Sequence, residues 1–112
     1  MMAALVLIAE GDPFNLRLLQ ELCEDAGFAI VTAADGDTAL NVVARQRPSL
    51  IVLDASLRTE DGAEVLEVLG SDAALAPIPV LLTGEGNDVA ARRRGRDLGA
   101  HDFVPRPYKV HQ

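Results

Sequence analysis

The chain has 112 residues, enough for one hydrophobic core and hence one domain spanning residues 1–112, and its 49% of apolar residues argues against disorder. A formal net charge of −7 argues against non-specific binding to nucleic acid or an anionic membrane, and no apolar run is long enough to span a bilayer. Cys23 is the only cysteine, which excludes an internal disulfide, and we expect it to be a buried packing residue of a cytoplasmic protein.

Short apolar runs bounded by turn residues alternate with helical patterns along the chain. Runs of this length predict strands buried on both faces of a sheet. The five predicted strands are residues 3–9, 29–33, 50–54, 79–83 and 102–104. Pro105 directly follows the last run, and because proline has no N–H to donate, we expect that strand at the edge of the sheet.

Four helices are predicted between these strands. The first begins at Pro13, after an N-cap at Asp12, and stops before Gly27. The second and third are marked by apolar stripes at helical spacing, which are Ala39, Leu40, Val43 and Ala44 in one and Val65, Leu66 and Leu69 in the other. The fourth, Asp88–Leu98, is the weakest prediction because arginines and Gly95 interrupt its apolar stripe.

Alternating strands and helices predict an α/β fold, in which a five-stranded parallel sheet is covered on both faces and connected by right-handed crossovers. In such a sheet the carboxyl ends of all strands share one edge, where open α/β folds place their chemistry. Polar side chains end or follow four of the strands: Glu10, Asp54, Thr83 and Arg106. We therefore expect these four residues to converge.

The types of these residues indicate phosphoryl chemistry. Two neighbouring carboxylates, Glu10 and Asp54, need a cation, and hard oxygen donors with open positions suit Mg²⁺. A hydroxyl and a fixed positive charge, from Thr83 and Arg106, can hold an oxyanion such as a phosphoryl group. Asp54 would then be placed to act as the nucleophile of an in-line phosphoryl transfer.

A series of short fragments, in order, carries a family resemblance. The fragments are Ala9–Pro13, Thr32–Gly36, Pro48–Asp54, Asp61–Gly62, Ile78–Gly84, Leu98–Ala100 and Phe103–Tyr108. Over nearly the whole chain the sequence resembles the receiver domains of two-component response regulators. The resemblance implies a doubly wound, flavodoxin-like sheet with strand order 2-1-3-4-5. It also implies a single receiver domain whose C-terminal helix is missing or truncated.

The resemblance further implies a role for individual residues. Asp54 would accept a phosphoryl group from a sensor histidine kinase or phosphotransfer protein, with Mg²⁺ held by Glu10, Asp54 and the backbone carbonyl of Ser56. Thr83 would contact the phosphoryl oxygens, and the Arg106–Pro107 peptide would be cis. The domain would not be an enzyme beyond self-phosphorylation from a phosphodonor and autodephosphorylation.

The output of such a domain would pass through a switch face. Phe103 is expected to change rotamer on activation, together with Thr83. The part of this face that contacts a downstream protein or output domain would then include Arg92, Arg93 and Arg96. A missing last helix would expose apolar surface on one side of the sheet, which predicts weak stability or association, including a homodimer.

Two departures from the family pattern leave alternatives open. Gly11 stands where a second acid is usual, so Asp12, better suited as a helix cap, is the remaining candidate metal ligand. Arg106 replaces a lysine, and it could pair bidentately with Asp54 and occupy the phosphoryl pocket. A degenerate receiver, acting as a phosphorylation-independent interaction module, is the alternative. A small α/β enzyme is disfavoured because no Gly-rich phosphate loop follows the first strand.

Overall fold

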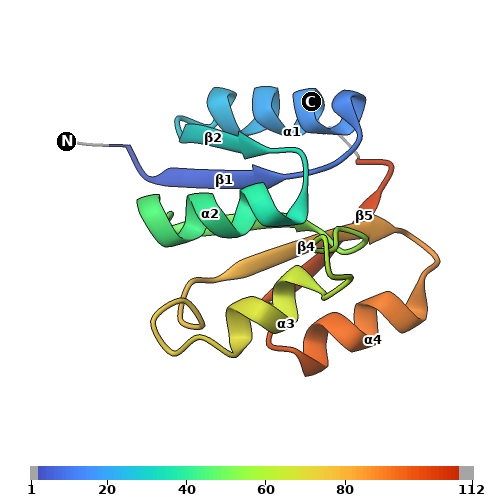
Figure 1. Cartoon of the computed structure of the whole chain (residues 1–112). Helices are drawn as coiled ribbons and strands as arrows, with labels where there is room; N and C mark the ends of the chain where they lie inside the picture. Colours follow the sequence, from blue (N-terminus) through green and yellow to red (C-terminus); the bar gives the residue numbers. More distant parts are fainter. Residues whose placement is uncertain (1–2, 109–112) are drawn as a thin grey trace.

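Strands and helices alternate from Leu5 to Arg106 in the computed structural model, which describes residues 3–108 (Figure 1). The strands are β1 (Leu5–Ala9), β2 (Ala29–Ala33), β3 (Leu50–Asp54), β4 (Val80–Glu85) and β5 (Asp102–Arg106). The helices are α1 (Pro13–Asp25), α2 (Gly36–Gln46), α3 (Val65–Gly70) and α4 (Val89–Asp97). The predicted element order is therefore confirmed.

All five strands are parallel, in the order β2-β1-β3-β4-β5, which confirms the doubly wound, flavodoxin-like sheet. β5 is an edge strand, as Pro105 predicted. The bounds of three strands were predicted wrongly. β1 begins two residues later than expected, whereas β4 and β5 run past their apolar cores because backbone pairing continues as far as Glu85 opposite Arg106. Arg106 thus ends β5 instead of following it.

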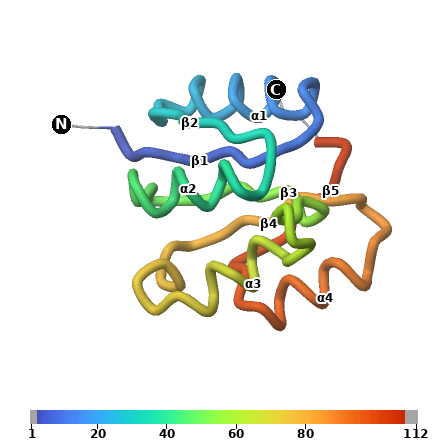
Figure 2. Tube along the Cα trace, in the orientation of Figure 1, coloured from blue at the N-terminus to red at the C-terminus, as the bar shows by residue number. Residues whose placement is uncertain are grey.

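Within residues 3–108, helices cover both faces of the sheet, with α1 on one face and α2, α3 and α4 on the other (Figures 1 and 2). The face under α1 carries a small cluster of buried side chains, which we call the α1-side cluster: Val6, Ile8, Leu19 and Val52. Cys23 packs against this cluster as expected, but it is half-buried and not fully buried as predicted. The larger core, which includes Leu7, Leu53, Leu66 and Leu82, lies on the opposite face.

The helix predicted least firmly, α4, is held by contacts that its own sequence pattern does not reveal. Asp88 caps it by accepting a hydrogen bond from the backbone N–H of Ala91 (2.9 Å). Gly95 faces Leu82 so closely that a Cβ at this position would collide with the leucine side chain. The glycine that weakens the helix intrinsically thus permits its close packing on β4.

The segment after β5 bears on the missing-helix prediction. Tyr108, the last described residue, packs against the α1-side cluster. A C-terminal helix would begin in residues 109–112, which lie outside the described residues. Between residues 3 and 108, none of the helices combines the length and the apolar character needed to cross a membrane.

Candidate functional site

The four polar residues predicted to converge do so at the carboxyl edge of the sheet. Asp54 of β3 is the direct register partner of Thr83 in β4. Because side chains alternate along a strand, Glu10 and Asp54, each two residues beyond a member of the α1-side cluster, point to the α1 side of the sheet. Glu10, Asp54 and Thr83 are all buried, with 1%, 5% and 1% of their surfaces exposed. The pattern therefore brings a hydroxyl and two carboxylates into one buried site.

Ser56 fixes the orientation of Asp54. Its backbone N–H and its hydroxyl both donate to Oδ1 of Asp54, at 2.9 and 2.8 Å. The other oxygen, Oδ2, faces Arg106. The family resemblance implied only a backbone-carbonyl role for Ser56, and these two donors were not predicted. Their signal was present, since an aspartate followed two residues later by serine is typical of a side-chain-capped turn.

Arg106 lies among three carboxylates. Its Nη1 is 3.0 Å from Oε1 of Glu10 and 3.6 Å from Oδ2 of Asp54, while Nη2 is 3.6 Å from Oε1 of Glu85. The arginine side chain is only 15% exposed, so these interactions are weakly screened by solvent. The close partner of Arg106 is therefore Glu10, and the bidentate Arg106–Asp54 pair considered above is not formed.

The pKa values of the two buried carboxyl groups are shifted in opposite directions. Burial raises the pKa of Glu10 to about 7, and the adjacent Asp54 adds to the rise against the opposing effect of Arg106. Burial also raises the pKa of Asp54, but hydrogen bonds from Glu10 and Ser56 and the charge of Arg106 outweigh it, so this pKa falls below its ordinary value. Just below pH 7, Asp54 is thus ionised while Glu10 is the carboxyl that holds a proton.

We expect this division to make stability depend on pH. Because the folded-state pKa of Glu10 lies above its ordinary 4.5, the protonated form contributes stability that is complete below pH 4.5 and lost as the pH rises through 7. Urea unfolding in the presence of EDTA measures this effect. Between pH 5 and pH 8 the free energy of unfolding of wild type should fall by on the order of 3 kcal/mol, whereas that of Glu10→Gln should not show this fall. Asp54, with its lowered pKa, titrates below this window.

The exposed Glu85 provides the control for this measurement. It contacts Arg106 from the solvent side, with 70% of its side chain exposed, so Glu85→Gln should keep the wild-type pH dependence. Parallel pH profiles for wild type and Glu10→Gln would contradict the assignment of the proton to Glu10.

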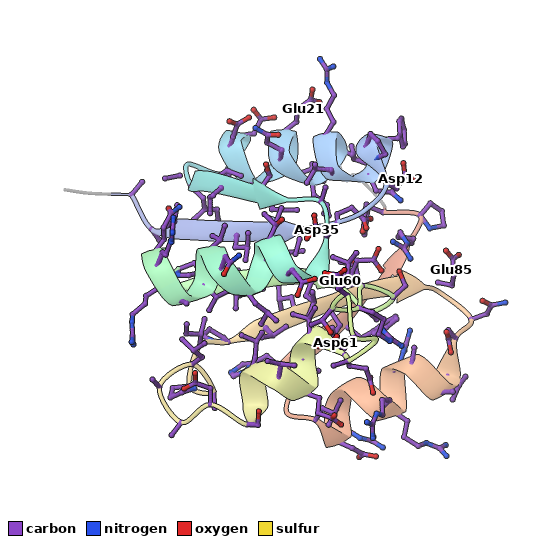
Figure 3. All side chains as sticks on the ribbon, in the orientation of Figure 1. Asp12, Glu21, Asp35, Glu60, Asp61 and Glu85 are labelled. Carbon is purple, nitrogen blue, oxygen red and sulfur yellow. The ribbon has the colours of Figure 1, made fainter. Side chains whose placement is uncertain are left out.

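The oxygen ligands available at this site determine whether it can hold Mg²⁺. Asp12, labelled in Figure 3, caps α1 by accepting from Phe14 N–H and from the amide of Asn15, so its carboxylate is engaged at the helix start. Gly11 offers no side chain. Within residues 3–108 no group of three or more acidic, histidine or cysteine side chains is arranged to hold a metal ion. A guanidinium lies between the two remaining carboxylates, and in this arrangement the donors do not fit Mg²⁺.

The candidate switch face adjoins the site through β4 and β5. Phe103 packs against the larger core and lies against Gly84, where a Cβ would come within 2.8 Å of the ring. The guanidinium of Arg92 is 5.0 Å from the ring centroid, a cation–π distance. A cavity of about 220 Å³ lies beside them, lined also by Arg96. The Arg106–Pro107 peptide is cis, as the resemblance implied.

Comparison with known families decides the identity of this fold. The family described as "Response regulator receiver domain" matches residues 6–112. This chain belongs to that family. Among curated relatives, the nitrogen assimilation regulatory protein NtrX of Azorhizobium caulinodans is 37% identical over 97% of the chain, which covers 24% of NtrX. The alkaline phosphatase synthesis transcriptional regulatory protein PhoP of Bacillus subtilis is 33% identical over 92% of the chain and 42% of PhoP.

Solved structures agree with this assignment. The signal receiver domain of a signal transduction histidine kinase from Syntrophus aciditrophicus superposes with a TM-score of 0.82 at 29% identity, covering 96% of this chain and 81% of that chain. The chemotaxis protein CheY4 of Vibrio cholerae shares the fold, with a TM-score of 0.83 at 23% identity and coverage of 97% and 90%. The receiver domain spans well under half the length of the curated relatives it matches. It is a signalling module of two-component systems.

Proposed function

We propose that this receiver domain accepts a phosphoryl group on Asp54 from a histidine kinase or a phosphotransfer protein. The observation that carries the proposal is an ionised, buried Asp54 whose register neighbour on the next strand, Thr83, carries a buried hydroxyl. Oδ1 of Asp54 is held by Ser56, so the carboxylate is fixed before a donor arrives. A fixed nucleophile beside a hydroxyl donor and a cation suits in-line phosphoryl transfer.

The proposed step uses Oδ2 of Asp54 as the nucleophile. A bond forms between Oδ2 and phosphorus while the bond between phosphorus and the donor breaks, and its electron pair leaves with the donor. The product is an acyl phosphate on Asp54. Arg106, 3.6 Å from Oδ2, would balance the negative charge brought by the phosphoryl group, and Thr83 would donate to one of its oxygens.

Magnesium is expected to bind this domain weakly. Glu10, Asp54 and the backbone carbonyl of Ser56 are the proposed donors, whereas Asp12 is committed to the helix cap. When bound, the ion would neutralise phosphoryl charge. Arg106 would have to leave Glu10 for such binding, since its Nη1 donates to that carboxylate at 3.0 Å.

The proposed output is a shift between two states of the switch face. Phe103 would change its packing against Gly84 when Thr83 turns to a phosphoryl oxygen, and Arg92 would follow because it lies over the ring. Arg93 and Arg96, both exposed, would take part in contacts with an acidic downstream protein or output domain. We propose action in the cytoplasm, without direct contact to nucleic acid or membrane, with a homodimer as one mode of association.

Labelling by a small phosphodonor tests the proposal. Wild type incubated with acetyl phosphate and Mg²⁺ should gain one phosphoryl group by intact mass, and Asp54→Asn should gain none. A receiver domain known to be labelled under the same conditions serves as the positive control. If that control is labelled while wild type stays at its unmodified mass, the phosphoacceptor function is wrong.

The degenerate receiver is the second candidate, and the position of Arg106 favours it. The guanidinium lies 3.0 Å from Glu10 and 3.6 Å from Asp54, so when Glu10 holds its proton the charge of Asp54 is balanced without a metal or a phosphoryl group. In such a domain, wild type and Asp54→Asn would bind the partner equally well. Acetyl phosphate would label neither of them. The mass measurement therefore separates the two candidates.

A further inference from the structure

Two buried hydroxyl groups at the site lack partners. Neither Oγ1 of Thr83 nor the phenol oxygen of Tyr108 makes a hydrogen bond within residues 3–108, although both atoms are inaccessible to solvent. A buried hydroxyl without a partner is unfavourable, so each such group calls for an explanation, and one explanation is a bound molecule that completes its bonding. Two unpartnered hydroxyl groups at one site need a common explanation.

The two hydroxyls lie close together on the α1 side of the sheet. Tyr108 packs its ring against the α1-side cluster, the same side to which Asp54 points. Burial raises the pKa of Tyr108, and the neighbouring hydroxyl of Thr83 opposes that rise. The charges of Glu10, Arg106 and Asp54 also act on the phenol. Tyr108 is therefore a neutral donor at the inner side of the site.

We propose that Tyr108 is a positioning residue that orients the hydroxyl of Thr83 toward a phosphoryl group on Asp54. A threonine hydroxyl has one proton to donate and two lone pairs to accept. When Thr83 donates its proton to a phosphoryl oxygen, its lone pairs become the natural acceptor for the phenol O–H of Tyr108. The result is a chain of two hydrogen bonds, from Tyr108 to Thr83 and from Thr83 to the phosphoryl oxygen.

Such a chain strengthens both of its bonds and pairs both unsatisfied hydroxyls at once. Each hydrogen bond polarises the next in a site of low dielectric constant. Neither hydroxyl has a protein partner within residues 3–108, and the proposed chain gives a partner to each. The inference rests on the proposed phosphorylation of Asp54 and adds Tyr108, which the sequence analysis did not assign to the site.

Rates and a spectroscopic signal together test the inference. Tyr108 is the only tyrosine in a chain without tryptophan, so tyrosine absorbance and emission report on this phenol alone. Acetyl phosphate with Mg²⁺ should change the tyrosine signal of wild type as the mass increases, and Thr83→Ala should abolish that change in whatever fraction is labelled. Tyr108→Phe keeps the ring but should be labelled about threefold to tenfold more slowly, the effect of one lost hydrogen bond.

A matched control separates this role from packing. Cys23 packs against the same α1-side cluster but carries no hydroxyl, so Cys23→Ala should be labelled at the wild-type rate. If wild type is labelled but Tyr108→Phe reacts at the same rate and the tyrosine signal stays constant, the inference is overturned and the phosphoacceptor function stands. If wild type is not labelled at all, the proposed function fails and the positioning role fails with it.

Discussion

Replacing Arg106 by methionine is expected to lower the free energy of unfolding at pH 8 by about 3–5 kcal/mol, the usual cost of leaving a buried charge unpaired. The arginine is 15% exposed and donates to Glu10 at 3.0 Å. Its removal leaves two carboxylates, Glu10 and Asp54, side by side in a buried site. Methionine preserves most of the apolar stem, so the loss reports on charge more than on packing.

Urea unfolding at two pH values measures this effect. At pH 5 the cost should shrink, because the raised pKa of Glu10 leaves it protonated and neutral. Arg94→Met is the matched control: Arg94 pairs with Glu64 and Glu67 at 2.8 and 3.0 Å but is 51% exposed, so its loss should cost less than about 1 kcal/mol. Equal losses for Arg106→Met and Arg94→Met would show that the buried ion pair does not stabilise the fold.

A double variant, Gly11→Asp with Arg106→Lys, is expected to bind Mg²⁺ at least about tenfold more tightly than wild type, a difference of about 1.4 kcal/mol. The new aspartate supplies the third carboxylate that the site lacks. There is room for it, because a Cβ at Gly11 would meet its nearest neighbours, Leu57 and Ala34, at 3.4 and 3.6 Å. Lysine carries a compact ammonium in place of the planar, multidentate guanidinium that now contacts three carboxylates.

Calorimetric titration with MgCl₂ gives the affinity directly, without any phosphodonor. The single variants Gly11→Asp and Arg106→Lys show how much of the gain in Mg²⁺ affinity comes from the added carboxylate and how much from the removed guanidinium. Adding Asp54→Asn to the double variant should abolish the tighter binding, since it removes one of the carboxylates. A double variant that folds normally but binds Mg²⁺ no better than wild type would mean that Gly11 and Arg106 do not limit metal binding.

The fold was predictable because its signals are local. Each strand is a short apolar run and each helix has a cap or an apolar stripe, so alternation alone led to a parallel sheet. The boundaries were less predictable, because β4 and β5 continue as far as their backbones pair, through Glu85 and Arg106, where hydrophobicity no longer marks a strand. The α4 helix likewise depends on a tertiary contact, Gly95 against Leu82, that its own pattern does not contain.

Which residues form the site was predictable from the sequence, but which of them contact each other was not. The ends of parallel strands share an edge, which brought together Glu10, Asp54, Thr83 and Arg106. Which carboxylate Arg106 approaches depends on the rotamers of a long side chain, and strand periodicity does not determine these. The preference of Arg106 for Glu10 therefore appears only in three dimensions. Tyr108, to which we assign a positioning role, was not predicted for a related reason, since it follows the last strand and its packing on the α1-side cluster is a tertiary contact.

The proline in β5 has a consequence for how two copies of the domain could associate. An exposed outer strand is ordinarily a template on which a strand from another molecule can form a ladder of hydrogen bonds. Pro105 lies within β5, opposite Gly84, and has no N–H to offer such a strand. A continuous sheet running through two molecules is therefore disfavoured on the β5 side, and contacts there must form between side chains.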